Sequence, residues 1–271
     1  MKEEKTLELI WSRRSIRDFE RREIDKETVD TLKAMTLRAP SAGNMEMYTI
    51  IEVEDKEKKR ALAEICDGQK MIENAPLVWI FLSDMEKWER YFILSKSPEK
   101  FSIPLPQLGL GDMLLSFEDA VIAAQNSVIA AEALGLGSCY IGDVLENGEK
   151  LISLLSLPPH VIPAAMVIFG YPKSKERHQS TPRPNISSTV FMKDGYRERS
   201  LEELEDEYSG HRKYNEEHNR VPLCGKGSVA DEYYSRKYTS AFMAEMNRSA
   251  LMYVGDTWEG KRENSFPAIR I

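Results

Sequence analysis

The chain carries a compact basic cluster near its beginning, in the sequence RRSIRDF at residues 13–19. Its three guanidinium groups and one hydroxyl belong to Arg13, Arg14, Ser15 and Arg17. A guanidinium group is a planar fork of donors that can bind a phosphate through two hydrogen bonds, and it stays charged at any working pH. Ile16 and Phe19 are apolar and are expected to face inward, which would anchor the segment. We take as a hypothesis that the cluster binds the phosphate of a nucleotide-type cofactor. The open alternative is a solvated basic turn that pairs with Glu20 and Glu23.

A second candidate for ligand contact is a loop of small residues, with the sequence APSAGN at residues 39–44. It follows a helix that is expected to begin after the N-cap residue Asp25 and to end near Arg38. Pro40 stops the helix, and Gly43 allows backbone conformations in which the main chain approaches a flat ligand closely. An ordinary helix-to-strand turn is the open alternative for this loop.

The overall composition excludes several classes of protein in which the basic cluster and the loop could otherwise occur. The 271 residues suffice for one large domain or two small ones, and a hydrophobic content of 42% supports a sizeable core. The net charge of -7, from 37 basic and 44 acidic residues, argues against general nucleic-acid binding. No apolar run is long enough to span a bilayer, and the opening residues MKEEK do not form a signal peptide, so no membrane association is expected.

The cysteines indicate a reducing compartment. There are 3 of them, at positions 66, 139 and 224, and their wide spacing argues against a disulfide scaffold and against a zinc site. We therefore expect a cytoplasmic protein without a metal centre. Cys139 falls in a glycine-rich strand, where a buried structural thiol is favoured over a redox-active one.

Hydrophobic patterning predicts the elements that position the two candidate segments. Strands are expected at residues 48–53, 77–82, 136–143, 163–170 and 190–192, and helices at residues 56–65, 84–96, 117–134, 201–208 and 228–253. The helix at 117–134 is rich in alanine and carries few charges, so it should be buried nearly all round, in a domain centre or a subunit interface. Glu118 and Asp119 are interpreted as structural residues at its N-terminus, where acidic side chains interact favourably with the helix dipole.

Two stretches of the sequence show no clear periodicity of apolar residues. Residues 97–116 carry three prolines and two glycines and are interpreted as a long excursion that forms a lid or a substrate wall. Residues 211–227 are expected to form a polar loop within a C-terminal region of different composition. The chain is therefore divided into a main domain at residues 1–196 and a helical extension at residues 197–271, which wraps the body or a partner subunit.

These segments occur together in the order typical of one family. The basic cluster, the small-residue loop, the tripeptide Gly68-Gln69-Lys70, the alanine-rich helix with its glycine-rich strand, and the strand that ends at Pro172 resemble the flavin-dependent nitroreductases over residues 7–196. The tail is more loosely similar to the NADPH-type nitroreductases and flavin reductases. The resemblance implies an α+β fold, in which helices wrap a central mixed, mainly antiparallel sheet, and an intertwined homodimer with FMN at the interface.

The resemblance also implies roles for individual residues in binding FMN. The residues assigned to its phosphate are Arg13, Arg14, Ser15, Arg17 and, from a later segment, Arg183. Those assigned to a loop that reaches the flavin from the other subunit are Pro40, Ser41, Ala42 and Asn44. Those assigned to the flavin ring or ribityl chain are Gln69, Tyr140, Ile141 and Gly142. The family often has lysine two residues before the later arginine, where this chain has Thr181, and compensation would have to come from Lys173, Lys175 or Arg177.

The function implied by the resemblance is that of an FMN-dependent oxidoreductase. By a ping-pong route, NADH or NADPH would deliver hydride to the flavin, and a small electron-poor acceptor such as a nitroaromatic compound or a quinone would then take the electrons. The chemistry belongs to the cofactor, so no catalytic side chain is expected. A reductive dehalogenase or an enone reductase of the same fold, and a flavin-carrying protein without significant turnover, remain open alternatives.

Overall fold

The computed structural model describes residues 2–174, 182–184, 189–218 and 227–259. They fall into two compact units. The first contains the described residues up to 174 together with those from Met246 to Glu259, and the second contains the described residues from 182 to Glu245. No helix within these ranges is both long and apolar enough to cross a lipid bilayer.

A four-stranded antiparallel sheet forms the centre of the first unit. Its strands, in spatial order, are β1 (Tyr48–Glu52), β2 (Leu77–Asp84), β4 (Val161–Gly170) and β3 (Gly137–Ile141). The central strands β2 and β4 are buried at every position, which explains why their sequences are continuous apolar runs rather than alternating patterns. A parallel bridge joins Ser15 to Ser138 at the outer edge of β3. The predicted α+β fold with a mainly antiparallel sheet is therefore confirmed.

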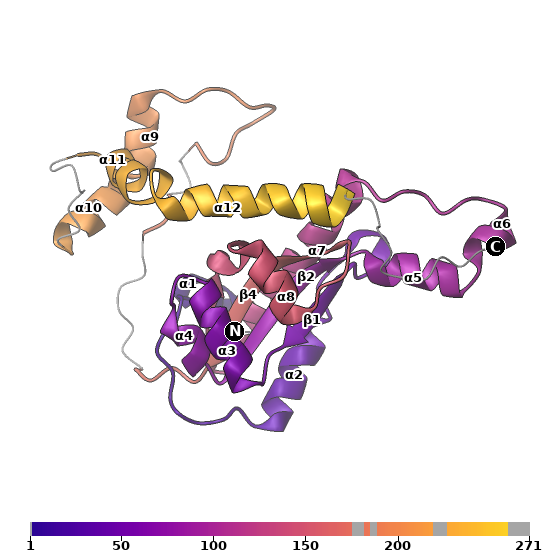
Figure 1. Cartoon of the computed structure of the whole chain (residues 1–271). Coiled ribbons are helices and arrows are strands. Elements are labelled where there is room, and N and C mark those ends of the chain that lie inside the picture. The colour runs from indigo at the N-terminus through magenta and orange to yellow at the C-terminus, as the bar shows by residue number, and fades with distance from the viewer. Residues whose placement is uncertain (1, 175–181, 185–188, 219–226, 260–271) are drawn as a thin grey trace. The chain divides into compact units, whose positions relative to one another are not determined.

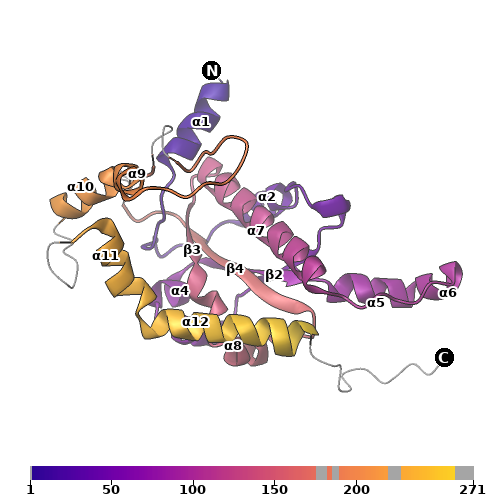
Figure 2. The same ribbon diagram turned by 90° about the horizontal axis from the view of Figure 1, so that it is seen from above.

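Helices cover both faces of this sheet (Figure 1 and Figure 2). One face is covered by α2 (Lys26–Thr36) and α7 (Leu110–Ala133), and the other by α3 (Lys56–Ile65), α4 (Lys70–Asn74) and α8 (Gly148–Leu155). The side chains of β2 alternate between two hydrophobic cores, because successive residues of a strand point to opposite faces. Trp79 and Phe81 join α7, whereas Ile80 and Leu82 join α3 and α8. A further helix, α1 (Lys2–Ser12), precedes the basic cluster.

Helix α7 begins at Leu110, earlier than the start at residue 117 that the sequence predicted. The prediction was wrong because the glycines before residue 112 concealed a helix cap, in which the Gly109 N–H donates to the Asp112 carboxylate at 2.9 Å. Glu118 and Asp119 therefore lie in the interior of the helix, away from its N-terminus. The interpretation of both residues as partners of the helix dipole is also wrong.

The described residues bury only one face of α7. The buried residues are Ser116, Asp119, Ala120, Ala123, Ala124, Ser127, Val128 and Ala131. The opposite face carries Leu114, Leu115, Val121 and Ile122, whose exposed fractions lie between 37% and 58%. Burial nearly all round was expected, so that expectation is wrong for the single chain. A large apolar face of the helix is left available to a partner.

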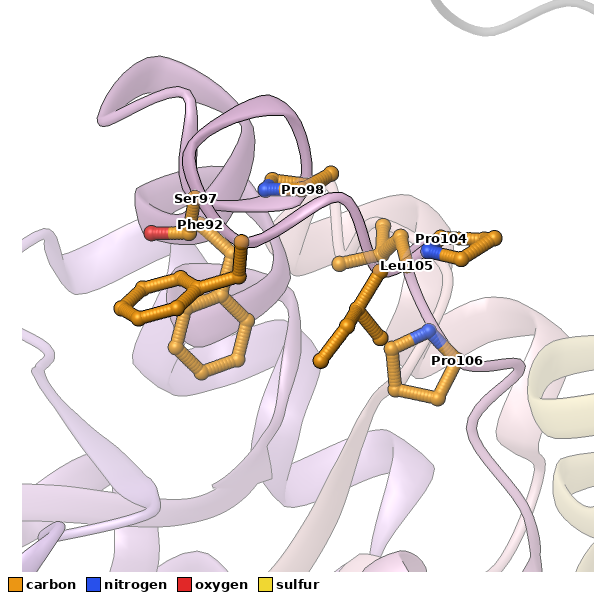
Figure 3. Close-up of a pocket in the computed structure, with 8 residues that line it drawn as sticks. Phe92, Ser97, Pro98, Pro104, Leu105 and Pro106 are labelled. Atoms are coloured by element: carbon orange, nitrogen blue, oxygen red, sulfur yellow. The ribbon is translucent and has the colours of Figure 1, made fainter.

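Two helices occupy the segment between β2 and α7. They are α5 (Glu86–Leu94) and α6 (Ser97–Phe101), and they project away from the sheet (Figure 2). The excursion predicted at residues 97–116 is thus partly helical. Pro98 does not prevent α6 from forming, since it stands in the first turn, where proline is tolerated. Apolar side chains that include Phe92, Leu105 and Pro106 line a shallow groove of about 190 Å³ here (Figure 3). That the segment acts as a lid or a substrate wall stays a prediction.

The second unit is helical. It contains α9 (Leu201–Glu207), α10 (Ser209–Glu217), α11 (Val229–Tyr233), the π-helical turn η3 (Tyr234–Tyr238) and the first residues of α12 (Ala241–Met252). The strand predicted at residues 190–192 is a turn, because Val190 and Phe191 are exposed and no strand among the described residues pairs with them. The polar loop predicted at residues 211–227 is wrong up to the end of α10, and residues 219–226 lie outside the described residues.

The single long helix predicted at residues 228–253 is divided into pieces. Ser228 caps the first piece as predicted. The helix is interrupted after η3, where the Ser240 hydroxyl donates to the Lys237 carbonyl at 2.5 Å and so competes with backbone hydrogen bonding. A second π-helical turn, η4 (Tyr253–Glu259), continues α12 within the first unit.

Candidate functional site

The basic cluster runs along the outer edge of β3. The Ile16 N–H donates a hydrogen bond to the Ser138 carbonyl at 2.8 Å, which holds the segment against the strand. Ile16 also packs directly on Gly137, where an added Cβ atom would come within 2.6 Å of the Ile16 side chain. Phe19 packs in the same way on Gly170, 2.8 Å from the corresponding Cβ position. The expectation that Ile16 and Phe19 anchor the cluster is confirmed.

Three polar side chains of the cluster gather near the buried thiol of Cys139. Burial raises the pKa of Cys139, while the charge of Arg17, a hydrogen bond from Ser15 and the charge of Arg13 each oppose this rise. The bridge between Ser15 and Ser138 places this part of the cluster directly beside Cys139. Cys139 is 3% exposed, as expected for a structural thiol. The result is a concentration of positive charge at the edge of β3.

Two arginines of the cluster keep their charge available for a ligand. In the part of the chain that the structure describes, neither Arg13 nor Arg17 forms an ion pair with a carboxylate. Glu20 pairs instead with Arg22 at 2.7 Å, so the alternative of a basic turn neutralised by its own neighbours fails for these two arginines. Arg14, between them in sequence, is half-buried.

The later residues considered for the phosphate differ in where the structure places them. Lys173 lies beside the cluster, where its ammonium pairs with the Asp18 carboxylate at 3.0 Å. Lys175, Arg177 and Thr181 lie outside the described residues. Arg183 belongs to the second unit, so its place at the site stays a prediction.

The backbone of β3 offers hydrogen-bonding groups at an open edge. The Ser138 carbonyl points outward toward the basic cluster, and the N–H and C=O of every second residue point to the same edge of a strand. The backbone groups of Tyr140 therefore face outward too. The hydroxyl oxygen of Ser138 is buried and has no hydrogen-bond partner among the described residues. This is the edge at which the predicted backbone contacts of Tyr140, Ile141 and Gly142 would be made.

Gln69 lies at the far end of β3. It is the N-cap residue of α4 and follows Gly68, whose φ of 68° is a left-handed conformation that favours glycine. Its side-chain amide donates to the carboxylate of Asp143, in the turn η2 (Gly142–Leu145) that directly follows β3. One edge of the sheet thus collects the basic cluster, the β3 backbone and Gln69. Sequence reasoning missed Asp143, for which the available signal was an acidic residue directly after the glycine-rich strand.

A buried carboxylate holds the small-residue loop. The centre of the loop is the turn η1 (Ala42–Asn44), in which Gly43 adopts a φ of 59°. Asp119 of α7 is 2% exposed, and its two oxygens accept hydrogen bonds from the N–H groups of Ala42 at 2.8 Å and Met47 at 3.2 Å. Sequence reasoning missed this role. The available signal was an acidic residue four positions before Ala123, on the alanine-rich side of the helix.

The loop and the basic cluster are far apart within one chain. The loop precedes β1 at one edge of the sheet, whereas the cluster lies along β3 at the other edge. Asp119 holds the loop, and Ala131 lies next to the start of β3, so the helical rise of about 1.5 Å per residue separates them by roughly 18 Å along α7. The loop residues are exposed (Pro40, Asn44) or half-buried (Ser41, Ala42). One chain therefore does not bring the loop together with the β3 edge.

Comparison with models of protein families shows to which family the chain belongs. A family model described as the Nitroreductase family matches residues 10–171, which contain all four strands and every assigned site residue except Arg183. The chain belongs to the nitroreductase family. The family resemblance seen in the sequence is confirmed.

Two named relatives of this nitroreductase-family chain come from bacteria. It is similar to an FMN reductase (NADPH) of Bacillus subtilis (strain 168), with 34% identity over 167 residues that cover 62% of this chain and 66% of the relative. It is also similar to an oxygen-insensitive NADPH nitroreductase of Salmonella typhimurium, with 32% identity over 168 residues that cover 62% of this chain and 65% of the relative. Both matches span just under two thirds of the relative's length.

A solved structure extends the likeness to nearly the whole chain. The structure of B. megaterium NfrA1 is similar with a TM-score of 0.75 and 26% identity, and the match covers 95% of this chain and 100% of that one. The similarity therefore reaches beyond the region that the family model matches, into the C-terminal extension.

Proposed function

We propose that this nitroreductase-family chain is an FMN-dependent oxidoreductase that takes hydride from NADH or NADPH and passes it to an electron-poor acceptor such as a nitroaromatic compound or a quinone. The observation that carries the proposal is the edge of β3, where Arg13, Arg17, an outward-facing backbone and Gln69 follow one another. The names of the two bacterial relatives, an FMN reductase and an NADPH nitroreductase, support the same activity.

The residues at this edge suit the parts of FMN. A phosphate requires fixed positive charge, and Arg13 and Arg17 provide it without a carboxylate partner in the described part of the chain. The buried hydroxyl of Ser138 is available to a polar group of the ligand, since no described residue satisfies it. A flat ring can lie along the strand, where the backbone groups of Tyr140 face outward.

In this proposal FMN supplies the redox chemistry when bound, and the chain binds and orients it. The phosphate would be held by Arg13, Arg14, Ser15, Arg17 and Arg183. The ring and ribityl chain would be contacted by Gln69, Tyr140, Ile141 and Gly142. No side chain has to act as a nucleophile. In the ping-pong route the reductant leaves before the acceptor binds, so both can use the same space in turn.

The active unit in this proposal is a homodimer. The small-residue loop lies roughly 18 Å along α7 from the β3 edge, which is too far to contact the same ring from within one chain. A second copy can supply the loop, and the exposed apolar face of α7 gives it a surface to cover. Pro40, Ser41, Ala42 and Asn44 of each chain would then reach the flavin that the other chain holds.

The helical extension at residues 197–271 is proposed to wrap the body or the partner subunit. Contacts of the described residues from Met246 onward support this part of the proposal. Tyr253 and Trp258 are buried in a hydrophobic cluster of the first unit together with Met47 and Ile162. A cytoplasmic location, predicted from the cysteines, stays a prediction.

The function is tested with the purified protein. We expect it to be yellow, to oxidise NADPH or NADH when a quinone or nitroaromatic compound is supplied, and to show the parallel double-reciprocal lines of ping-pong kinetics. A colourless protein that takes up no added FMN would overturn the proposal. A yellow protein without acceptor-dependent oxidation would indicate a flavin carrier. A strong preference for enones or halogenated aromatics would indicate the specialised reductase.

A further inference from the structure

The small-residue loop owes its shape to a buried charge on α7. Asp119 is 2% exposed, and each of its oxygens accepts one backbone hydrogen bond, from Ala42 at 2.8 Å and from Met47 at 3.2 Å. Burying a carboxylate is unfavourable unless hydrogen bonds compensate, so packing alone would favour a small apolar residue at this position of an alanine-rich helix. The two bonds join the centre of the loop to the residue directly before β1.

Two side chains of α5 hold carbonyl groups of residues 45–48, which connect the loop to β1. The Lys87 ammonium donates to the carbonyls of Glu46 and Tyr48, the latter at 2.6 Å. The Trp88 indole N–H donates to the Met45 carbonyl at 2.8 Å. The loop clamp, as we term this group, consists of Lys87, Trp88 and Asp119. It fixes a donor of the loop, together with a donor and three acceptors of residues 45–48 directly after it, from two different helices.

We propose that the loop clamp is a positioning device for the flavin: Asp119 and Lys87 hold the loop in the conformation that presents it to the FMN of the partner subunit. This inference rests on the proposed function. Ordering a flexible loop costs conformational entropy, and a loop that is ordered beforehand avoids that cost when the ligand binds. Asp119 and Lys87 act through the loop backbone, so both are positioning residues.

Asp119→Asn tests the clamp because it removes the charge and nearly keeps the shape. The amide has one acceptor oxygen and a donor NH₂ group, so one of the two loop N–H groups must face another donor. We expect faster hydrogen exchange of the backbone amides at residues 40–47 in the FMN-free protein. The folded variant should bind FMN roughly 10- to 100-fold more weakly. The visible circular dichroism of bound FMN should also change, which a loss of stability alone would not produce.

Asp30→Asn is the matched control, because Asp30 is exposed on α2 and undergoes the same change from carboxylate to amide. It should leave exchange, FMN affinity and dichroism as in the wild type. Lys87→Met removes the ammonium but keeps an unbranched side chain, and it should reproduce the effects of Asp119→Asn even if that variant does not fold.

Two results separate the failure of this inference from the failure of the proposed function. If Lys87→Met and folded Asp119→Asn both bind FMN with wild-type affinity and dichroism, the clamp has no positioning role, and the proposed function stands. If the wild type itself binds no FMN, the proposed function is wrong, and the role of the clamp toward the flavin is wrong with it.

Discussion

Replacing Arg13 and Arg17 together by alanine is expected to give a folded protein that purifies without FMN. The two arginines flank Ser15, which bridges to β3 at Ser138, and neither has a carboxylate partner in the described part of the chain. A charge-assisted hydrogen bond contributes about 1.5–3 kcal/mol, so losing both arginines should weaken FMN binding roughly 10²- to 10⁴-fold. Fluorescence titration measures the affinity for FMN, and light scattering shows whether the dimer persists.

Arg21→Ala combined with Arg22→Ala is the matched control, because it removes the same charge a few residues away. Both side chains are exposed, and Arg22 is already paired with Glu20 at 2.7 Å and lies over the Tyr171 ring, 3.5 Å from its centroid. This variant should bind FMN nearly as the wild type does. Full flavin occupancy in the Arg13/Arg17 variant would show that the phosphate is held elsewhere.

Mixed dimers test whether each FMN site is shared between two chains. In a shared arrangement, one Arg13→Ala/Arg17→Ala chain paired with one Asp119→Asn chain forms one intact site and one site with both defects. In an arrangement within single chains, both sites of the mixed dimer are defective. The mixed dimer, isolated through two different affinity tags, should therefore bind one FMN with wild-type affinity. Two weakened sites would contradict the shared arrangement.

Trp258→Ala is expected to lower the free energy of unfolding by about 3–5 kcal/mol, the largest stability effect that we predict. Trp258, in η4, is 1% exposed and packs in a hydrophobic cluster with Met47, Ile162 and Tyr253. Removing its indole ring leaves a cavity that well-packed neighbours fill only in part. Chemical unfolding of the FMN-free protein measures the loss.

Hydrogen bonds tie Trp258 to two separate elements. Its indole N–H donates to the Gly109 carbonyl at 2.9 Å, directly before α7, and its own carbonyl oxygen lies 3.1 Å from Nε2 of His160. Trp258→Phe keeps most of the buried ring but loses the indole N–H, so we expect a smaller loss of about 1–2 kcal/mol. Equal losses in the alanine and phenylalanine variants would contradict the argument from the cavity.

The sequence by itself determined the features that depend on local pattern. The continuous apolar runs at residues 77–82 and 163–170 predicted the two central strands, because a strand covered on both faces needs apolar residues at every position. Asp25 was predicted as an N-cap, and its carboxylate accepts a hydrogen bond from the Thr28 N–H at 2.8 Å. The basic cluster was recognisable because the types and spacing of its side chains are local properties as well.

Only the tertiary structure decided which distant residues meet. Asp119 acts on Ala42, 77 residues away in sequence, and Asp143 on Gln69, 74 residues away. No local pattern in the sequence encodes such distant partners. The order of the strands, set by long-range packing, places the small-residue loop and the basic cluster at opposite edges of the sheet. That separation is the physical reason why the proposed site needs a second subunit.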